Sequence, residues 1–373
     1  MNYLLECANE MAGKRTLLIA ALMVSALVGA VPVHAEATTT KAAKAKAKPA
    51  AKTAAATPAG APAKRPLYSA ERSLTRQAKL ARARAAAMSR EIAANQPRYK
   101  TDAAGDVVPD VRAAAAIIYD PETGKVLWEE NSQDQRSIAS ITKMMTAVVY
   151  MEDNPDLNQE VLVSRSDTFQ ASTTHLRAND HVTADELLHL LLISSDNAAA
   201  RALARISPYG TEGFVARMNE KAADLGLTMT HYADPSGLLS DNVSSAYDMA
   251  RLITFVSGDD RIASVMRTPE YSVTIGRRPI TVHSTNHLLG KPGVDVLAGK
   301  TGFIRAAGYC LATLLRLPSS NQQVAVVVLG ARSNAGRFNE TQNLFDWLSS
   351  KASTIFATGA KTPVAVADPS IAQ

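Results

Sequence analysis

Three short polar motifs, far apart in the chain, constrain the fold of these 373 residues more than any other feature. In chain order they are Ser140-Ile141-Thr142-Lys143, Ser195-Asp196-Asn197 and Lys300-Thr301-Gly302. Each motif alone is too short to be informative. Together they supply serines, lysines and an asparagine, which are residue types that cooperate in nucleophilic catalysis. The fold must therefore bring widely separated segments to one site.

The first motif pairs an alcohol with an amine. A serine hydroxyl needs a neighbouring base to become a nucleophile, and Lys143 can reach Ser140 from one turn further along a helix. Lys143 must be neutral to accept a proton, so we expect burial or a nearby positive charge, for which Lys300 is a candidate, to lower its pKa. The apolar neighbours Ile141 and Met145 argue against a solvated surface lysine.

The second motif follows a leucine-rich segment that predicts a helix, so its residues are expected at the edge of a cleft. Ser195 would relay the proton to the leaving group. Asn197 would hydrogen-bond the substrate amide and Lys143, and Asp196, which would point away from the cleft, is interpreted as structural.

The third motif supplies a second lysine. Lys300 and Thr301 would hold an anionic group of the substrate, and Gly302 would let the substrate backbone lie close to a strand. Ser140 stands at or near the start of a helix, where backbone N–H groups and the helix dipole favour negative charge. These features predict stabilisation of an oxyanion.

The first hundred residues differ from the rest in composition. Lys14-Arg15 and a following apolar run that ends at Val33-His34-Ala35 predict a secretory signal peptide over residues 1–35, with an uncleaved N-terminal anchor as the alternative. Residues 36–66 are almost entirely Ala, Lys, Thr and Pro. Such a segment has too few large apolar groups to offset the entropy of ordering, so we interpret it as a disordered tether.

Residues 67–100 are interpreted as a basic helical segment, because 67–96 contains no Gly or Pro and is dominated by Ala and Arg. Residues 101–358 form the expected catalytic domain, and 359–373 form a tail. The export signal predicts a periplasmic protein, either soluble or peripherally associated with the membrane. Nothing in the sequence indicates a cofactor or a metal.

The formal charge of +5 hides a division of the chain. Residues 1–100 carry 17 Lys and Arg against 5 Asp and Glu, which gives +12, whereas residues 101–373 carry 23 against 30, which gives −7. An exported protein rarely meets nucleic acid, so anionic wall polymer or lipid headgroups are the expected partners of the basic arm. A merely solvated spacer is the alternative.

Strand patterns occur at both ends of the expected catalytic domain, with helices between them. Residues 113–119 and 125–130 predict one hairpin, and 308–317 and 323–329 predict another. Helices are expected over 137–151, 182–193, 197–205, 211–225 and 339–356. We therefore expect a mixed α/β (α+β) fold whose antiparallel sheet joins distant segments, with a mostly helical lobe and the active site between them.

Further segments complete a resemblance that covers roughly residues 110–350. They are Met218-Asn219-Glu220-Lys221-Ala222, Leu225-Gly226-Leu227, Asp234-Pro235-Ser236-Gly237-Leu238 and Ala307-Gly308-Tyr309-Cys310. With the three motifs, the chain resembles the low-molecular-mass penicillin-binding proteins, in their D-alanyl-D-alanine endopeptidase branch (the penicillin-binding protein 7 type). This family belongs to the serine D-Ala-D-Ala carboxypeptidases.

The resemblance implies a β-lactamase-like fold and action on D-alanyl stem peptides of peptidoglycan, with β-lactams as inhibitors. It implies catalytic roles for Ser140, Lys143 and Ser195. It also implies an oxyanion hole made by the backbone N–H groups of Ser140 and Phe303. Lys300 and Thr301 would bind the C-terminal carboxylate of the D-alanyl peptide.

Two activities of this family remain open from the residues, since one acyl-enzyme serves an endopeptidase and a carboxypeptidase. Only 71 residues follow Gly302, which leaves no room for the C-terminal domain and anchor typical of the carboxypeptidase branch. The endopeptidase is therefore the expectation, and a D-alanyl-D-alanine carboxypeptidase is the alternative.

Three other classes fit the sequence less well. A class A β-lactamase needs a deacylating glutamate, and Glu212, Glu220 and Glu270 do not occur in the expected context. A zinc peptidase could use His283 and His287, but no H-E-x-x-H pattern accompanies them. A wall-binding protein without activity would explain the basic arm but not the motifs. Cys310 lies in an apolar string and is expected to be a buried thiol.

Overall fold

The computed structural model describes residues 68–318 and 320–357. The predicted signal peptide, tether and C-terminal tail lie outside these residues, and their boundaries stay predictions. Among the described residues, a five-stranded antiparallel sheet has the order β11-β12-β13-β3-β4. Its strands are β3 (Ala115–Tyr119), β4 (Val126–Glu130), β11 (Asp295–Ile304), β12 (Gly308–Arg316) and β13 (Gln323–Ala331).

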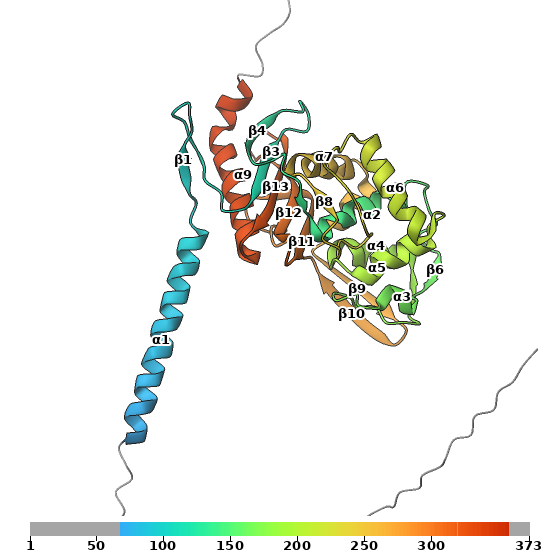
Figure 1. The fold of residues 1–373 in the computed structure, drawn as a ribbon, viewed down its shortest axis with the longest axis horizontal. Helices are drawn as coiled ribbons and strands as arrows, with labels where there is room; N and C mark the ends of the chain where they lie inside the picture. The colour runs from blue at the N-terminus through green and yellow to red at the C-terminus, as the bar shows by residue number, and fades with distance from the viewer. Residues whose placement is uncertain (1–67, 319, 358–373) are drawn as a thin grey trace, which may run out of the picture. The chain divides into compact units, whose positions relative to one another are not determined.

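This sheet joins the two ends of the described body, as predicted. Strand β13 pairs with β3 so that Val326 stands opposite Ile118 and Val327 opposite Ile117. Both expected hairpins are present, one between β3 and β4 and one between β12 and β13. Strand β11, which carries the third motif, lies at one edge of the sheet (Figure 1).

Alternating side chains cover the two faces of the sheet, because successive residues of a strand point to opposite sides. Ile117 and Val327 join the core that contains helix α7 (Ala246–Ser257). Ile118 and Val326 join a second core with helix α9 (Asn334–Ala357). The sheet therefore separates α7 from α9, and only the α7 face continues into the helical lobe.

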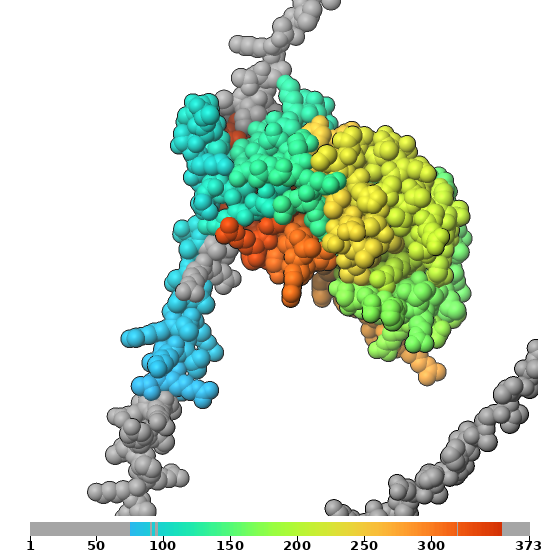
Figure 2. Space-filling view, viewed as in Figure 1, coloured from blue at the N-terminus to red at the C-terminus, as the bar shows by residue number. Residues whose placement is uncertain are grey.

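The helical lobe lies beside the sheet, in the green and yellow part of Figure 2. Its helices are α2 (Lys143–Met151), α3 (Arg165–Thr168), α4 (Ala184–Ile193), α5 (Asn197–Ile206), α6 (Gly210–Asp224) and α8 (Asp260–Met266). Helix α4 supplies an almost continuous row of buried leucines to the large core that also covers α2 and α5. The expected helical lobe is thus confirmed.

Four short antiparallel pairs lie outside the main sheet and were not predicted. They are β1 (Tyr99–Thr101) with β2 (Val107–Pro109), β5 (Arg136–Ser137) with β8 (Val243–Ser244), β6 (Glu160–Leu162) with β7 (His181–Thr183), and β9 (Glu270–Ile275) with β10 (Arg278–His283). Before them in the chain, helix α1 (Tyr68–Asn95) falls within the segment predicted to be helical.

Several predicted helix boundaries were wrong, for identifiable reasons. The helix expected from Ser137 begins only at Lys143, because Ser137 pairs in β5 and Ala139 has a φ of 51°, which lies outside the α-helical region. A short 3-10 helix, η1 (Ala139–Thr142), comes between them. Helix α4 starts at Ala184 because Thr183 forms a capping box with Glu186.

Candidate active site

Ser140 and Lys143 stand at the junction between η1 and α2. The Nζ of Lys143 lies 3.0 Å from the Oγ of Ser140. The junction places the serine on a 3-10 turn and the lysine at the first position of the α-helix, so the two side chains meet on one face. The pairing inferred from the sequence is therefore present in the structure.

Lys143 is completely buried and has two further partners. Its Nζ lies 2.6 Å from Oδ1 of Asn197 and 2.5 Å from the backbone carbonyl of Ser236. A neutral amine has two N–H donors and one lone pair. Since both of these partners are acceptors, the two N–H groups are used by them, and the lone pair is left for the hydroxyl proton of Ser140.

The surroundings of Lys143 favour this neutral form. Burial lowers its pKa to about 7, and the positive charge of Arg201 acts in the same direction, whereas the carboxylates of Asp234 and Asp196 oppose the shift. Of the two causes that the sequence suggested, burial is thus the principal one, and the positive charge that adds to it is that of Arg201 and not of Lys300. Charge repulsion from Lys143 does help burial to lower the pKa of Lys300 well below its usual range.

The turn over residues 234–239 helps to position Lys143. The chemical roles inferred from the sequence did not include it. Asp234 accepts hydrogen bonds from the backbone N–H groups of Ser236, Gly237 and Leu239, which fixes the carbonyl of Ser236 toward the amine. Gly237 has a φ of 78°, and a side chain there would overlap the carbonyl of Ala139. Only the resemblance drew attention to this segment.

The second motif lies at the start of α5, where Asp196 is the N-cap and Asn197 is the first helical residue. Asp196 is completely buried and caps α5 by accepting from the N–H of Ala199, and its other oxygen accepts from the N–H of His175 at 2.6 Å. The structural role expected for this residue fits these contacts. Ser195 has a φ of 62° and lines the cleft with Ser140.

Asn197 connects the second motif to the catalytic pair. While its Oδ1 accepts from Lys143, its Nδ2 donates to the carbonyl of Ala171 at 2.6 Å, which fixes the orientation of the amide. No hydrogen bond joins the hydroxyl of Ser195 to another described side chain. Ser195 is therefore placed at the cleft without being tied to the lysine.

The third motif lies on β11, where Thr301 and Gly302 line the same cleft and Lys300 does not. Lys300 is almost completely buried, and Thr301 donates from its hydroxyl to Thr285 at 2.6 Å. A Cβ at Gly302 would lie 2.6 Å from the carbonyl of Ile138 and 3.2 Å from the backbone nitrogen of Ser140. The absence of a side chain thus lets β11 pack directly against the turn that carries the serine.

The cleft that collects these residues is small, with a volume of about 200 Å³. Besides members of all three motifs, Phe303 and Arg337 line it. Arg337 was not predicted. It extends from α9, donates to the carbonyls of Gly302 and Cys310, and has an Nε that finds no acceptor among the described residues. A lone arginine in a helix pattern offers no sequence signal for such a position.

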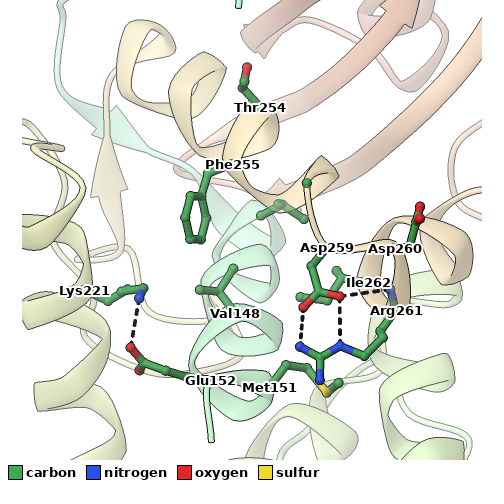
Figure 3. A pocket seen from close by; sticks show the side chains of 12 residues that line it. Val148, Met151, Glu152, Lys221, Thr254, Phe255, Asp259, Asp260, Arg261 and Ile262 are labelled. Carbon is green, nitrogen blue, oxygen red and sulfur yellow. Dashed lines mark hydrogen bonds and ion pairs between the residues drawn. The ribbon is translucent and has the colours of Figure 1, made fainter. Parts of the chain in front are cut away.

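A larger cavity, of about 750 Å³, lies elsewhere, at the C-terminal end of α2 (Figure 3). Val148, Met151 and Phe255 supply apolar surface, while Glu152 and Lys221 form an ion pair at its side (Figure 3). None of the residues of the three motifs lines it. The larger of these two cavities is therefore not the one that contains the residues of the three motifs.

The residues of the alternative readings lie outside the cleft. Glu212 and Glu220 belong to α6, and Glu270 on β9 lies 3.1 Å from a ring nitrogen of His283. His287 stacks on Phe338 instead of sharing a helix with His283. The Cys310 thiol is buried, as predicted, and burial raises its pKa to about 11.

Solved structures share this fold. The Streptomyces K15 DD-transpeptidase superposes with a TM-score of 0.60 at 26% identity, covering 64% of this chain and 97% of that one. A D-alanyl-D-alanine carboxypeptidase from Mycobacterium tuberculosis H37Rv gives 0.60 at 27% identity, covering 71% and 97%. The fold and the cleft therefore define a protein of the DD-peptidase class.

The family follows from the sequence match. The model of the D-alanyl-D-alanine carboxypeptidase family (Peptidase_S11) matches residues 101–333, and the chain belongs to this family. It is thus a serine-type DD-peptidase, a hydrolase. The resemblance inferred from the motifs is confirmed.

Relatives in this family carry two kinds of name. D-alanyl-D-alanine endopeptidases of Escherichia coli (strain K12) and Pseudomonas aeruginosa are each 33% identical, over 64% and 68% of this chain and 78% and 82% of their own lengths. The D-alanyl-D-alanine carboxypeptidase DacF of Bacillus subtilis is 32% identical over 65% of this chain and 63% of its own length.

Among the described residues, no helix is long and apolar enough to span a membrane.

Proposed function

We propose that this protein is a DD-endopeptidase that cleaves D-alanyl amide bonds at peptidoglycan cross-links, through an acyl-enzyme on Ser140. The observation that carries the proposal is the set of contacts around Lys143. A buried amine with both N–H groups donated to acceptors and its third position at the serine hydroxyl is arranged to act as a base.

In the first step, the Oγ of Ser140 attacks the carbonyl carbon of the D-alanyl residue while its proton passes to Nζ of Lys143. The carbonyl oxygen becomes an oxyanion, which the backbone N–H groups of Ser140 and Phe303 stabilise. The close packing of Gly302 on the serine turn supports this placement, because it brings the two backbone segments together.

Collapse of the tetrahedral intermediate breaks the C–N bond. Lys143 returns the proton through Ser195 to the departing amine, and the D-alanyl group stays on Ser140 as an ester. Water then attacks the ester with Lys143 as the base, which restores the serine. The position of Ser195 in the cleft, with its hydroxyl free of described side-chain partners, supports the relay.

Polar side chains at the cleft would bind the substrate. Thr301 and Arg337 line the cleft and would hold the carboxylate of the residue on the leaving side, together with Lys300, which is buried next to Thr301 and does not line the cleft. Asn197 would hold the substrate amide, and Gly302 would let its backbone approach β11. A cross-link and a free D-alanyl-D-alanine end both present a carboxylate here, so these contacts serve either substrate.

The preference for cross-links is supported by the relatives named endopeptidases, which this chain matches over about four fifths of their lengths. Incubation with purified cross-linked and uncross-linked muropeptides tests it. We expect faster release of monomers from the cross-linked dimers than of D-alanine from pentapeptides. Faster release of D-alanine would identify a carboxypeptidase.

We also propose that the protein is exported to the periplasm and that residues 36–66 contact anionic wall polymer. The signal-like composition of residues 1–35 and the many lysines of 36–66 support this. Deletion of 36–66 should weaken binding to whole sacculi at low salt and leave turnover of soluble muropeptides unchanged. Equal binding with and without the segment, at low and at high salt, would make it a spacer only.

A further inference from the structure

Phe303 is an exposed aromatic side chain at the rim of the cleft. It is 50% exposed although it lines the same cavity as Ser140 and Thr301. Its ring stacks on Tyr309, its register partner on β12, with centroids 4.2 Å apart and planes at 25°. The guanidinium of Arg337 lies over the Tyr309 ring on β12, so the stack is held in place.

The proposed mechanism uses only the backbone N–H of Phe303. A large apolar ring that is fixed in position and exposed beside a substrate cleft has surface available for a ligand. Because Thr301 and Phe303 are two residues apart on β11, their side chains lie on the same face of the strand, about 7 Å apart along it.

The orientation of the substrate determines which of its parts reaches this ring. The carboxylate on the leaving side would lie at Thr301 and the scissile carbonyl at the N–H of Phe303. The donor stem peptide therefore continues past Phe303 toward Arg305, along a strand that has no partner on its outer edge within the main sheet. The residue that precedes D-alanine in the donor would then lie over the ring.

Arg305 follows directly after β11, in the turn that leads to β12. Its side chain is exposed and forms no hydrogen bond or ion pair with any residue that the structure describes. A cation without a partner thus stands two residues beyond an apolar ring. This order matches a side chain that begins with a hydrocarbon chain and ends with a carboxylate.

We propose that Phe303 and Arg305 form a specificity subsite for the donor residue that precedes D-alanine, and that it selects a side chain with a hydrocarbon stem and a terminal carboxylate. The hydrocarbon part of that side chain packs on the Phe303 ring, and its carboxylate pairs with Arg305. The inference rests on the proposed function for the position of the scissile bond, but not on which amine leaves.

The test varies the donor and keeps the leaving group constant. Three thioesters of the form N-acetyl-X-D-alanyl-thiolactate carry meso-diaminopimelate, L-norleucine or L-alanine as X, and release of the thiol gives kcat/KM. In the wild type we expect about a tenfold fall from norleucine to alanine, as a lost apolar contact gives. We expect a fall of about threefold from diaminopimelate to norleucine, as an exposed ion pair gives, and a smaller one in high salt.

Each variant should remove one of these differences. Phe303→Ala should give norleucine and alanine donors nearly equal kcat/KM values. Arg305→Gln should do the same for diaminopimelate and norleucine donors. Two matched controls lie outside the cleft: Phe255→Ala removes another exposed phenylalanine, and Arg277→Gln another exposed turn arginine. Both controls should keep the wild-type ranking.

The subsite is overturned if Phe303→Ala slows all three donors by the same factor, because the ring would then only support the fold. It is also overturned if the wild type does not distinguish the donors. Hydrolysis of a cross-linked muropeptide dimer by the wild type is measured separately. Its absence, with the donor ranking present, would reject the endopeptidase and keep the subsite.

Discussion

The two ends of helix α2 differ in the environment that they give to charged groups. At its N-terminal end, Lys143 is buried among neutral groups: a hydroxyl, an amide oxygen and a backbone carbonyl. At its C-terminal end, Glu152 accepts from the guanidinium of Arg217 at 2.6 Å and from the amine of Lys221 at 2.8 Å. One end buries an amine in surroundings that favour its neutral form, and the other end pairs opposite charges.

The pKa directions record this difference. Burial lowers the pKa of Lys143 to about 7, toward the neutral form, whereas the hydrogen bond from Arg217 lowers the pKa of Glu152 to about 2 and keeps it charged. The paired end also has the larger cavity, 750 Å³ against 200 Å³ at the cleft. The candidate catalytic site is therefore marked here by a buried lysine whose pKa is lowered, and not by the volume of the cavity.

The largest expected effect distinguishes Lys143 from Lys221, the α6 lysine that pairs with Glu152 at the other end of α2. Lys143→Arg should lower the rate of acylation by benzylpenicillin about a thousandfold or more, because arginine keeps its proton at working pH and cannot act as a base. Lys221→Arg, which keeps an ion pair with Glu152 possible, should acylate like the wild type. Stopped-flow measurement of acylation gives both rates. Rapid acylation of the Lys143 variant would mean that another group is the base.

A second prediction concerns the packing of β11 on the serine turn. Gly302→Ala should slow acylation about a hundredfold, because a Cβ would displace the backbone of Ile138 and Ser140 from their positions. Gly276→Ala is the control, since its Cβ would meet open space and the backbone strain at its φ of 61° would be confined to the tip of the β9–β10 hairpin. Equal rates in the two variants would show that the close approach of β11 does not position the serine.

The neutral state of Lys143 predicts a pH dependence. Since the base must be deprotonated, the second-order rate of acylation should rise with pH and level off above a midpoint of about 7. The Lys221→Arg variant should have the same midpoint, because its charge belongs to the paired end. A rate that stays constant or falls between pH 6 and pH 8, roughly the range around that midpoint, would contradict a neutral lysine base.

The smallest effect belongs to the paired end and concerns stability. Glu152→Gln should reduce the free energy of unfolding at neutral pH by about 1 kcal/mol, since the pair is partly exposed. The folded pKa of Glu152 is depressed from 4.5, so its contribution is present above that value and lost as the pH falls toward 2. Urea unfolding at neutral and acidic pH checks this, and unchanged acylation is expected. Loss of acylation in this variant would show that the ion pair at the C-terminal end of α2 is needed for the reaction at its N-terminal end.

The parts of the site that were predictable are those whose signal is local. The spacing of Ser140 and Lys143 predicts their contact because one helical turn joins them. The two hairpins of the sheet were likewise predictable from alternation and turn residues. Their assembly into one sheet followed from strands at both ends of the body.

The parts that could not be predicted depend on contacts between distant segments. The carbonyl of Ser236 is a backbone atom, so no residue type announces that it binds Lys143. Arg337 reaches the cleft from α9 across the sheet edge, where neither periodicity nor spacing indicates a site. The late start of α2 depends on β5 pairing with β8, a contact between residues far apart in the chain.

One measurement tests the central claim most directly, which is that Ser140 is the nucleophile beside a neutral lysine. The wild type is incubated with labelled benzylpenicillin, digested, and the labelled peptide is identified by mass spectrometry. We expect a single stable adduct on Ser140, formed by the wild type and by Lys221→Arg but not by Lys143→Arg. An adduct on any other residue, or an active enzyme that takes up no label, would contradict it.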